Sequence, residues 1–267
     1  MRPLQSGFTL VELVMVIIIS SILAVGTTRF IAQSSQSLVT SSERLTLSTT
    51  AGLISERISR EVRSALPNSV RTFEDNGFSC LEFVPVINSS EYLSIPVAAA
   101  TNGFQAVQFA DGDFDSGYLS VYPSSTTEVY NTTTQTVTQV QVATAASAAT
   151  GVMDVSFPAG VTVQLPAESP TRRFYLVSQP VSFCEDTNGR VWRYFNYGFH
   201  ADSRTSLPAP AANRVVIGDG VQPGSLDFQL TPAQLQRNAM IRVSLTTQSG
   251  RGEQVSMTQE VQLRNVP

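Results

Sequence analysis

The sequence predicts an α+β protein in which one long amino-terminal helix is followed by a β-rich head. An apolar run extends from Phe8 to Val25, and Glu12 is its single charged residue. Apolar residues then recur every three or four positions as far as Leu66, which is the period of a helix with one buried face. After Pro67 the pattern changes to short β-branched runs separated by Gly, Pro, Asn and Ser, as in antiparallel sheets.

The apolar run is long enough to cross a membrane. From Phe8 to Val25 it would form about 27 Å of helix, near the lower limit for a hydrocarbon core of about 30 Å. Arg2 precedes the run and favours a cytoplasmic amino terminus, with the rest of the chain exported. The alternative is a secretory signal cleaved near Ala24-Val25-Gly26, but its apolar region would begin with an acid and be unusually long.

Glu12 is the unusual residue of this segment. An acid at the centre of a membrane helix costs about 2.5 to 3.5 kcal/mol, but Glu12 lies only about 6 Å into the helix. Its carboxylate can reach the headgroups and meet the positive amino end of the helix. A membrane acid also calls for a partner, and a free ammonium on the first residue of a neighbouring copy would be suitable if the chain were cut before Phe8.

The string GFTLVE from Gly7 to Glu12, followed by the apolar run, resembles the class III signal of type IV pilins and type II secretion pseudopilins. The resemblance implies that a prepilin peptidase cuts between Gly7 and Phe8 and methylates Phe8. It also implies that Glu12 pairs with the amino terminus of an adjacent subunit during assembly. The fold expected from the family is a stem helix packed on an antiparallel sheet, and an enzyme is not expected.

This resemblance divides the chain into a leader peptide (1–7), a transmembrane half of the helix (8–28), an amphipathic half (29–66) and an exported head (67–267). The amphipathic half carries one apolar stripe, formed by Leu47, Ala51, Ile54, Ile58, Val62 and Ala65. Two i,i+4 ion pairs are expected on it, Glu56 with Arg60 and Arg57 with Glu61. The stripe is expected to lie against the head.

The head is expected to contain many short strands. Candidate strands are Cys80–Val84, Gln105–Phe109, Thr136–Val142, Val161–Leu165, Arg173–Val177, Val191–Tyr194, Ala239–Thr246 and Val255–Leu263. The last two are separated by QSGRG at 248–252, which predicts a hairpin loop.

A head of this size is larger than that of a usual major pilin and favours a minor subunit. The segments Val177–Asp186, Gly189–Tyr194 and Glu260–Pro267 resemble the minor pilin-like proteins of mannose-sensitive haemagglutinin (MSHA) pilus biogenesis. A PilW-like or pseudopilin J-like minor subunit, the latter of a type II secretion system, is the alternative. The implied partners are other pilin or minor pilin subunits, the prepilin peptidase and an inner-membrane assembly platform. The implied location is the inner membrane, with the head periplasmic, and then an extracellular pilus.

Composition narrows the partners and the compartment. All 17 basic side chains are arginine, and the net charge of −4 argues against a nucleic-acid partner. Cys80 and Cys184 are the two cysteines, and an exported protein would favour a disulfide between them. Two buried free thiols are the alternative, because spacing alone does not establish pairing.

Three other features suggest sites, and for each a structural role is favoured. Asp111, Asp113 and Asp115 alternate as in calcium loops, but the glycine and distal glutamate of an EF-hand are missing. A solvated turn is therefore expected, and no cofactor. His200 is the single histidine, and no Gly-x-Ser-x-Gly elbow accompanies it, so a structural histidine is expected rather than a hydrolase.

The third feature is the aromatic cluster Trp192, Tyr194, Phe195, Tyr197 and Phe199. Such a cluster could form an adhesive surface, but packing in the core is the expected role. An anchored exported hydrolase or binding module is the competing class of function for the whole chain.

Overall fold

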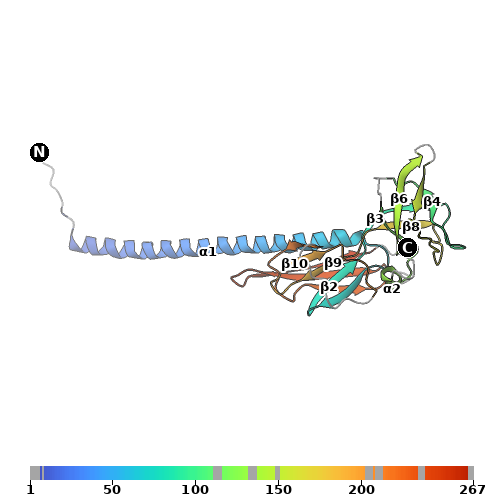
Figure 1. The fold of residues 1–267 in the computed structure, drawn as a ribbon. Helices are drawn as coiled ribbons and strands as arrows, with labels where there is room; N and C mark the ends of the chain where they lie inside the picture. The colour runs from blue at the N-terminus through green and yellow to red at the C-terminus, as the bar shows by residue number, and fades with distance from the viewer. Residues whose placement is uncertain are drawn as a thin grey trace.

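The computed structural model describes residues 7, 9–110, 116–131, 137–147, 151–201, 207, 213–233 and 238–263, with the backbone alone for 137–147. One long helix leads into a β-rich head (Figure 1). The predicted α+β class is confirmed, with a long apolar amino-terminal helix followed by antiparallel sheets.

The stem is α1, Leu10–Arg63, a helix of 54 residues. It ends three residues before the predicted end at Leu66, because the chain turns there to join the head. The N–H groups of Ser64 and Ala65 donate to the carbonyls of Glu61 and Val62, and the Leu66 N–H donates to Val84 at 2.8 Å. The last turn of the helix is thus tightened and then continued by a strand-like contact.

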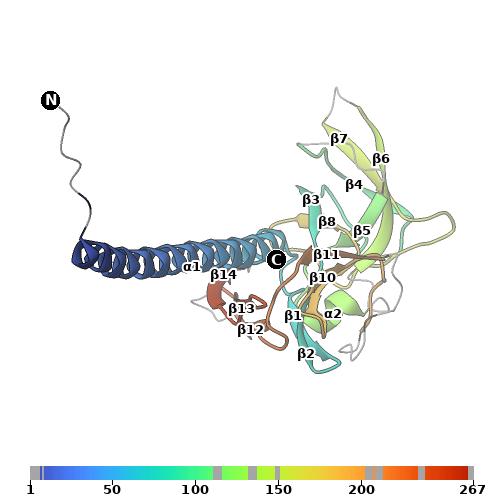
Figure 2. The same ribbon diagram turned by 90° about the vertical axis from the view of Figure 1, so that its left-hand side faces the viewer.

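The two halves of α1 have different surroundings. Leu47, Ala51, Ile54, Ile58 and Val62, all predicted to face the head, are at most 8% exposed. They pack on a core shared with two sheets. The half of the helix before them extends beyond the head in both views (Figures 1 and 2).

The part of the head next to α1, here called the stem-side lobe, contains two antiparallel sheets. The first has the strand order β1-β2-β9-β10-β11 and the second β12-β13-β14. The strands are β1 Arg71–Asp75, β2 Phe78–Phe83, β9 Val181–Glu185, β10 Val191–Tyr194, β11 Arg214–Gly218, β12 Asp227–Thr231, β13 Met240–Gln248 and β14 Gln254–Gln262. β1 and β2 are joined by Asn76 and Gly77, whose φ values of 50° and 83° suit a two-residue hairpin.

The second part of the head, here called the barrel lobe, is inserted between β2 and β9. Its sheet has the order β3-β8-β5-β6-β7-β4. Its elements are β3 Val86–Glu91, β4 Gly103–Val107, β5 Ser116–Ser120, α2 Thr126–Tyr130, β6 Val137–Ser147, β7 Val152–Ser156 and β8 Arg173–Val177. The two edges meet, because Tyr92 bridges to Ala106 and the Leu93 N–H donates to the Gln105 carbonyl at 2.9 Å.

The barrel lobe lies beyond the carboxyl-terminal end of α1 (Figures 1 and 2). It has its own core, which includes Phe104, Leu119 and Phe174. A small cluster around Leu66, Tyr130 and Val177 connects the two lobes. The head is therefore two packed units on one stem.

The predicted strands are confirmed with one exception. Val161–Leu165 forms no strand, since only Val163 pairs, in an isolated bridge with Thr101. The hairpin at 248–252 is confirmed, because β13 and β14 pair across it and the Ser249 N–H donates to the Glu253 carbonyl.

Candidate functional site

The amino-terminal end of α1 holds Glu12 through its own first turn. Thr9 is the N-cap, with extended backbone at φ −77° and ψ 149°. Its hydroxyl oxygen accepts the Glu12 N–H at 3.3 Å. In return, Glu12 Oε2 accepts the Thr9 N–H at 3.2 Å and the Thr9 hydroxyl at 3.0 Å. This reciprocal arrangement is a capping box, so in the single subunit the carboxylate is bound to the start of its own helix.

The predicted cleavage position lies just before this cap. Gly7 is exposed, outside the helix, and no other group lies within 4 Å of where a Cβ would stand. Phe8, the predicted methylated residue, lies outside the described residues. An exposed, non-helical glycine is a position that a peptidase can reach.

The apolar segment after Glu12 is uncovered. Every large apolar side chain from Leu10 to Val25 is at least 45% exposed. Among the described residues, α1 is the one helix long and apolar enough to cross a membrane, and none of its most apolar window is buried. Apolar surface of this extent is unfavourable in water. The segment requires lipid or other apolar helices around it.

The hydroxyl side chains in and just after the apolar segment are satisfied within the helix. Ser21 donates to the Ile17 carbonyl at 2.7 Å, and Thr27 donates to Leu23 at 2.8 Å. Thr28 donates to the Ala24 carbonyl at 3.0 Å. Because lipid offers no hydrogen-bond partners, this internal pairing removes the main cost of hydroxyl groups in a membrane helix.

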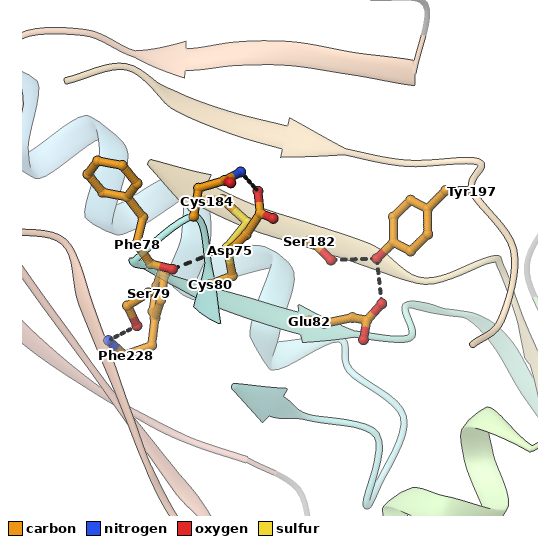
Figure 3. The surroundings of a disulfide bond; sticks show 10 residues. Asp75, Phe78, Ser79, Cys80, Glu82, Ser182, Cys184, Tyr197 and Phe228 are labelled. Carbon is orange, nitrogen blue, oxygen red and sulfur yellow. Dashed lines mark hydrogen bonds between the residues drawn. A yellow bond between two sulfur atoms is a disulfide. The ribbon is translucent and has the colours of Figure 1, made fainter. Parts of the chain in front are cut away.

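The two cysteines form a disulfide at the centre of the stem-side lobe. Cys80 of β2 lies opposite Cys184 of β9, with their Cα atoms 4.5 Å apart (Figure 3). The bond joins residues 104 positions apart in the sequence. It therefore links the strands that precede and follow the inserted barrel lobe, and the exported location that predicted it is consistent with its persistence.

A buried polar network beside the disulfide was not predicted. Glu82 is fully buried and forms an ion pair with Arg71. Its other oxygen accepts the Tyr197 hydroxyl at 2.8 Å, which also contacts Ser182 (Figure 3). The guanidinium of Arg71 donates to the His200 carbonyl at 2.9 Å. The sequence signal was a lone acid inside an otherwise apolar strand, which a buried carboxylate requires a cation to offset.

Two adjacent acids at the end of β9 have opposite pKa shifts. Burial raises the pKa of Glu185, and N–H donors from Leu226 and Gly224 offset part of that rise. Burial also acts to raise the pKa of Asp186, but hydrogen bonds outweigh it and the pKa is lowered. The donors are the Trp192 indole N–H at 2.8 Å and the Arg190 and Asn188 N–H groups. Both acids fix loops rather than line a cavity.

The other candidate residues do not converge on a reaction site. His200 is exposed, and its Nε2 lies 2.9 Å from the Tyr197 carbonyl. Asp111, Asp113 and Asp115 lie outside the described residues. Within the part of the chain that the structure describes, no group of three His, Cys, Asp or Glu side chains could hold a metal ion.

The aromatic cluster is divided among several environments. Phe195 packs on the stem-side core and Phe199 on the cluster that joins the lobes. Tyr194 packs beside the disulfide. Trp192 is half-buried and lies under the Arg214 guanidinium, 4.1 Å from the ring centre. These residues thus serve packing in different places and do not form one continuous patch.

Comparison with known proteins agrees with the geometry of the amino-terminal end. The family described as "Prokaryotic N-terminal methylation motif" matches residues 2–28. No curated protein and no solved structure matches the chain. The motif, the apolar helix and the antiparallel head together support the type IV pilin or pseudopilin class. Such a protein is membrane-anchored with a single span and assembles with other pilins, and its motif indicates a structural subunit rather than an enzyme.

Proposed function

We propose that the chain is a minor pilin-like subunit in the biogenesis of an MSHA-type pilus, most similar to the minor pilin-like protein MshO. One observation carries the assembly role: an apolar helical segment that the subunit itself leaves uncovered, with Glu12 at its start. The segments of the head that resemble MSHA biogenesis proteins support the finer assignment.

In this proposal, prepilin peptidase removes residues 1–7 by cutting between Gly7 and Phe8, and it methylates Phe8. Residues 8–28 hold the protein in the inner membrane, residues 29–66 continue the stem, and the head 67–267 faces the periplasm. The assembly platform then transfers the subunit into the filament. There Glu12 exchanges its contacts with Thr9 for the ammonium of a neighbouring subunit, since a charge-assisted pair is stronger than a neutral one.

The substitution Glu12→Gln tests this role sharply. Glutamine also completes a capping box, so the helix start is kept while the charge is lost. We expect the Glu12→Gln protein to be processed to an N-methylated Phe8, read by mass spectrometry, but to be absent from sheared filaments. Normal incorporation of Glu12→Gln would contradict the pairing. A mature protein that begins near Thr27 would contradict the proposal as a whole.

Deletion of the gene distinguishes the filament systems. Loss of surface pili with unimpaired type II secretion is the expected result. Loss of secretion with normal pili would instead assign the chain as a minor pseudopilin, because both families share the same amino-terminal chemistry.

A further inference from the structure

A basic groove lies where the carboxyl-terminal end of α1 meets the barrel lobe, close to β3 and β8 (Figure 1). Its volume is about 790 Å³. Its charged lining residues are Arg60 and Arg63 of α1 and Arg173 of β8, and Ser89 and Asn238 add polar side chains. No acidic residue lines it. The groove is therefore positively charged on two of its walls.

The three arginines of this groove have no acidic partner among the described residues. The predicted pair between Glu56 and Arg60 does not form there. Glu61, the next acid along α1, is occupied by Arg57 at 2.8 Å and Arg193 at 2.7 Å. Seven arginines elsewhere in the described chain do form ion pairs: Arg44, Arg57, Arg71, Arg190, Arg193, Arg242 and Arg251.

The position of Arg173 shows that the cluster is more than a helix end. Cations in the last turn, such as Arg60 and Arg63, are favoured by the helix dipole. Arg173 comes from a strand of the inserted lobe and is not explained in this way. It lies directly across the β3–β8 ladder from Glu91, yet the two form no ion pair in the described structure. Three like charges around one groove are favourable only when an anion is bound between them.

We propose that this groove binds carboxylate side chains of an acidic segment on a neighbouring pilin-class subunit; the identity of that neighbour rests on the proposed function. Guanidinium groups are suited to this ligand, because their planar donors bind carboxylates in pairs. A neighbouring head in a filament is also held at high effective concentration, so a modest intrinsic affinity suffices.

Other anions fit the position less well. Arg60 follows Val25 by roughly 50 Å of helix at ~1.5 Å per residue, so lipid headgroups are out of reach while the apolar segment spans the bilayer. Nucleic acid requires a more extended basic surface than three arginines on a chain of net charge −4. Protein carboxylates remain the favoured class.

The experiment uses the full chain in a nonionic detergent and a dye-labelled hexaglutamate peptide, with binding followed by fluorescence anisotropy. The test variant is Arg63→Gln/Arg173→Gln. The matched control is Arg29→Gln/Arg44→Gln, which removes the same charge from α1 outside the groove; Arg44 makes only a surface pair with Glu253. We expect saturable binding to the wild type and the control, weaker binding with added salt, and roughly tenfold weaker binding to the test variant.

Three outcomes would overturn the inference. The first is equal binding to the wild type and the test variant, and the second is no saturable binding at all. The third is stronger binding of a dye-labelled single-stranded oligonucleotide, or displacement of hexaglutamate by equimolar inorganic phosphate, which would assign the groove to phosphate. Because the assay needs no filament, its result is independent of the Glu12 test, and either proposal can fail while the other stands.

Discussion

At the scale of single residues, polar side chains act mainly by completing backbone ends. Thr9 completes the start of α1, and Asp186 closes the β9–β10 turn by accepting the Asn188 and Arg190 N–H groups. In both cases one short side chain satisfies donors that would otherwise be unpaired. Their contributions to stability are therefore local and can be measured separately.

Thr9→Ala should loosen the first turn of α1. It removes the hydroxyl that accepts the Glu12 N–H, and N-cap losses of this kind cost about 1 kcal/mol. We expect faster amide hydrogen exchange at Glu12 and Leu13 in detergent, by roughly fivefold. Thr9→Ser keeps the hydroxyl and should behave as the wild type. Equal exchange in Thr9→Ala and Thr9→Ser would show that the capping box does not order this turn.

Asp186 should stabilise the head in a pH-dependent way. Its pKa is lowered in the folded state, so its contribution is present above the ordinary value of 3.8 and is lost as the pH falls through the folded pKa. Asp186→Asn should cost about 1 to 2 kcal/mol in the free energy of unfolding at neutral pH.

Urea unfolding followed by circular dichroism at several pH values measures this difference. The gap between the wild type and Asp186→Asn should shrink as the medium becomes acidic. The control is Asp219→Asn, since that acid is 69% exposed and makes only a long surface pair with Arg190. A gap that stays constant with pH would exclude the charge of Asp186 as the cause.

At the scale of elements, the stem and head depend on a close approach between α1 and β11. A Cβ added to Gly218 would lie 2.3 Å from the Cδ1 and Cγ1 atoms of Ile54, which is fully buried. Gly218→Ala should therefore cost about 1 to 3 kcal/mol of stability through overpacking. Gly250→Ala is the matched control, because nothing lies within 4 Å of that position.

A double-mutant cycle with Ile54→Ala identifies the contact. Ile54→Ala alone should cost about 2 to 5 kcal/mol by leaving a cavity. The double variant should cost less than the sum of the two single changes by at least about 0.5 kcal/mol, as measured by urea unfolding. Strict additivity would mean that the cost of Gly218→Ala arises elsewhere.

The stem was predictable from sequence, whereas much of the sheet pairing was not. Apolar residues at steps of three or four marked the buried face of α1 because helical periodicity is local. The pairing of β2 with β9 depends on residues a hundred positions apart, which no local pattern encodes. β9 itself is buried along its whole length, including its serine and glutamate, and therefore shows no alternation.

The candidate site shows the same division. The motif from Gly7 to Glu12 is contiguous, so the sequence alone located it. The Arg71–Glu82 pair joins two strands of a hairpin and acquires its importance only from burial. The basic groove joins α1 to the inserted lobe, so its arginines are distant in sequence and became visible as a cluster only in the folded structure.

At the scale of the whole molecule, the barrel lobe is an insertion whose base is fastened in two ways. The disulfide joins β2 and β9, the strands on either side of the insertion. α2, which belongs to the inserted segment, returns to the stem-side lobe, where the Tyr130 hydroxyl donates to the Ser69 carbonyl at 2.7 Å. The Arg71 guanidinium lies 3.7 Å from the centre of the Tyr130 ring. The Arg71–Glu82 pair is thus placed between the lobes.

Arg71→Gln should weaken this junction strongly, because it leaves the buried Glu82 carboxylate without its cation. Breaking one partner of a buried pair costs about 3 to 5 kcal/mol, whereas replacing both partners costs much less. The double variant Arg71→Gln/Glu82→Gln should therefore be more stable than Arg71→Gln alone. Hydrogen exchange by mass spectrometry should show lost protection in β1, β2 and α2 with β4 and β7 still protected, because the barrel lobe has a separate core. Equal loss across β4 and β7 would mean that the two lobes unfold as one unit and that the junction is not a separate point of weakness.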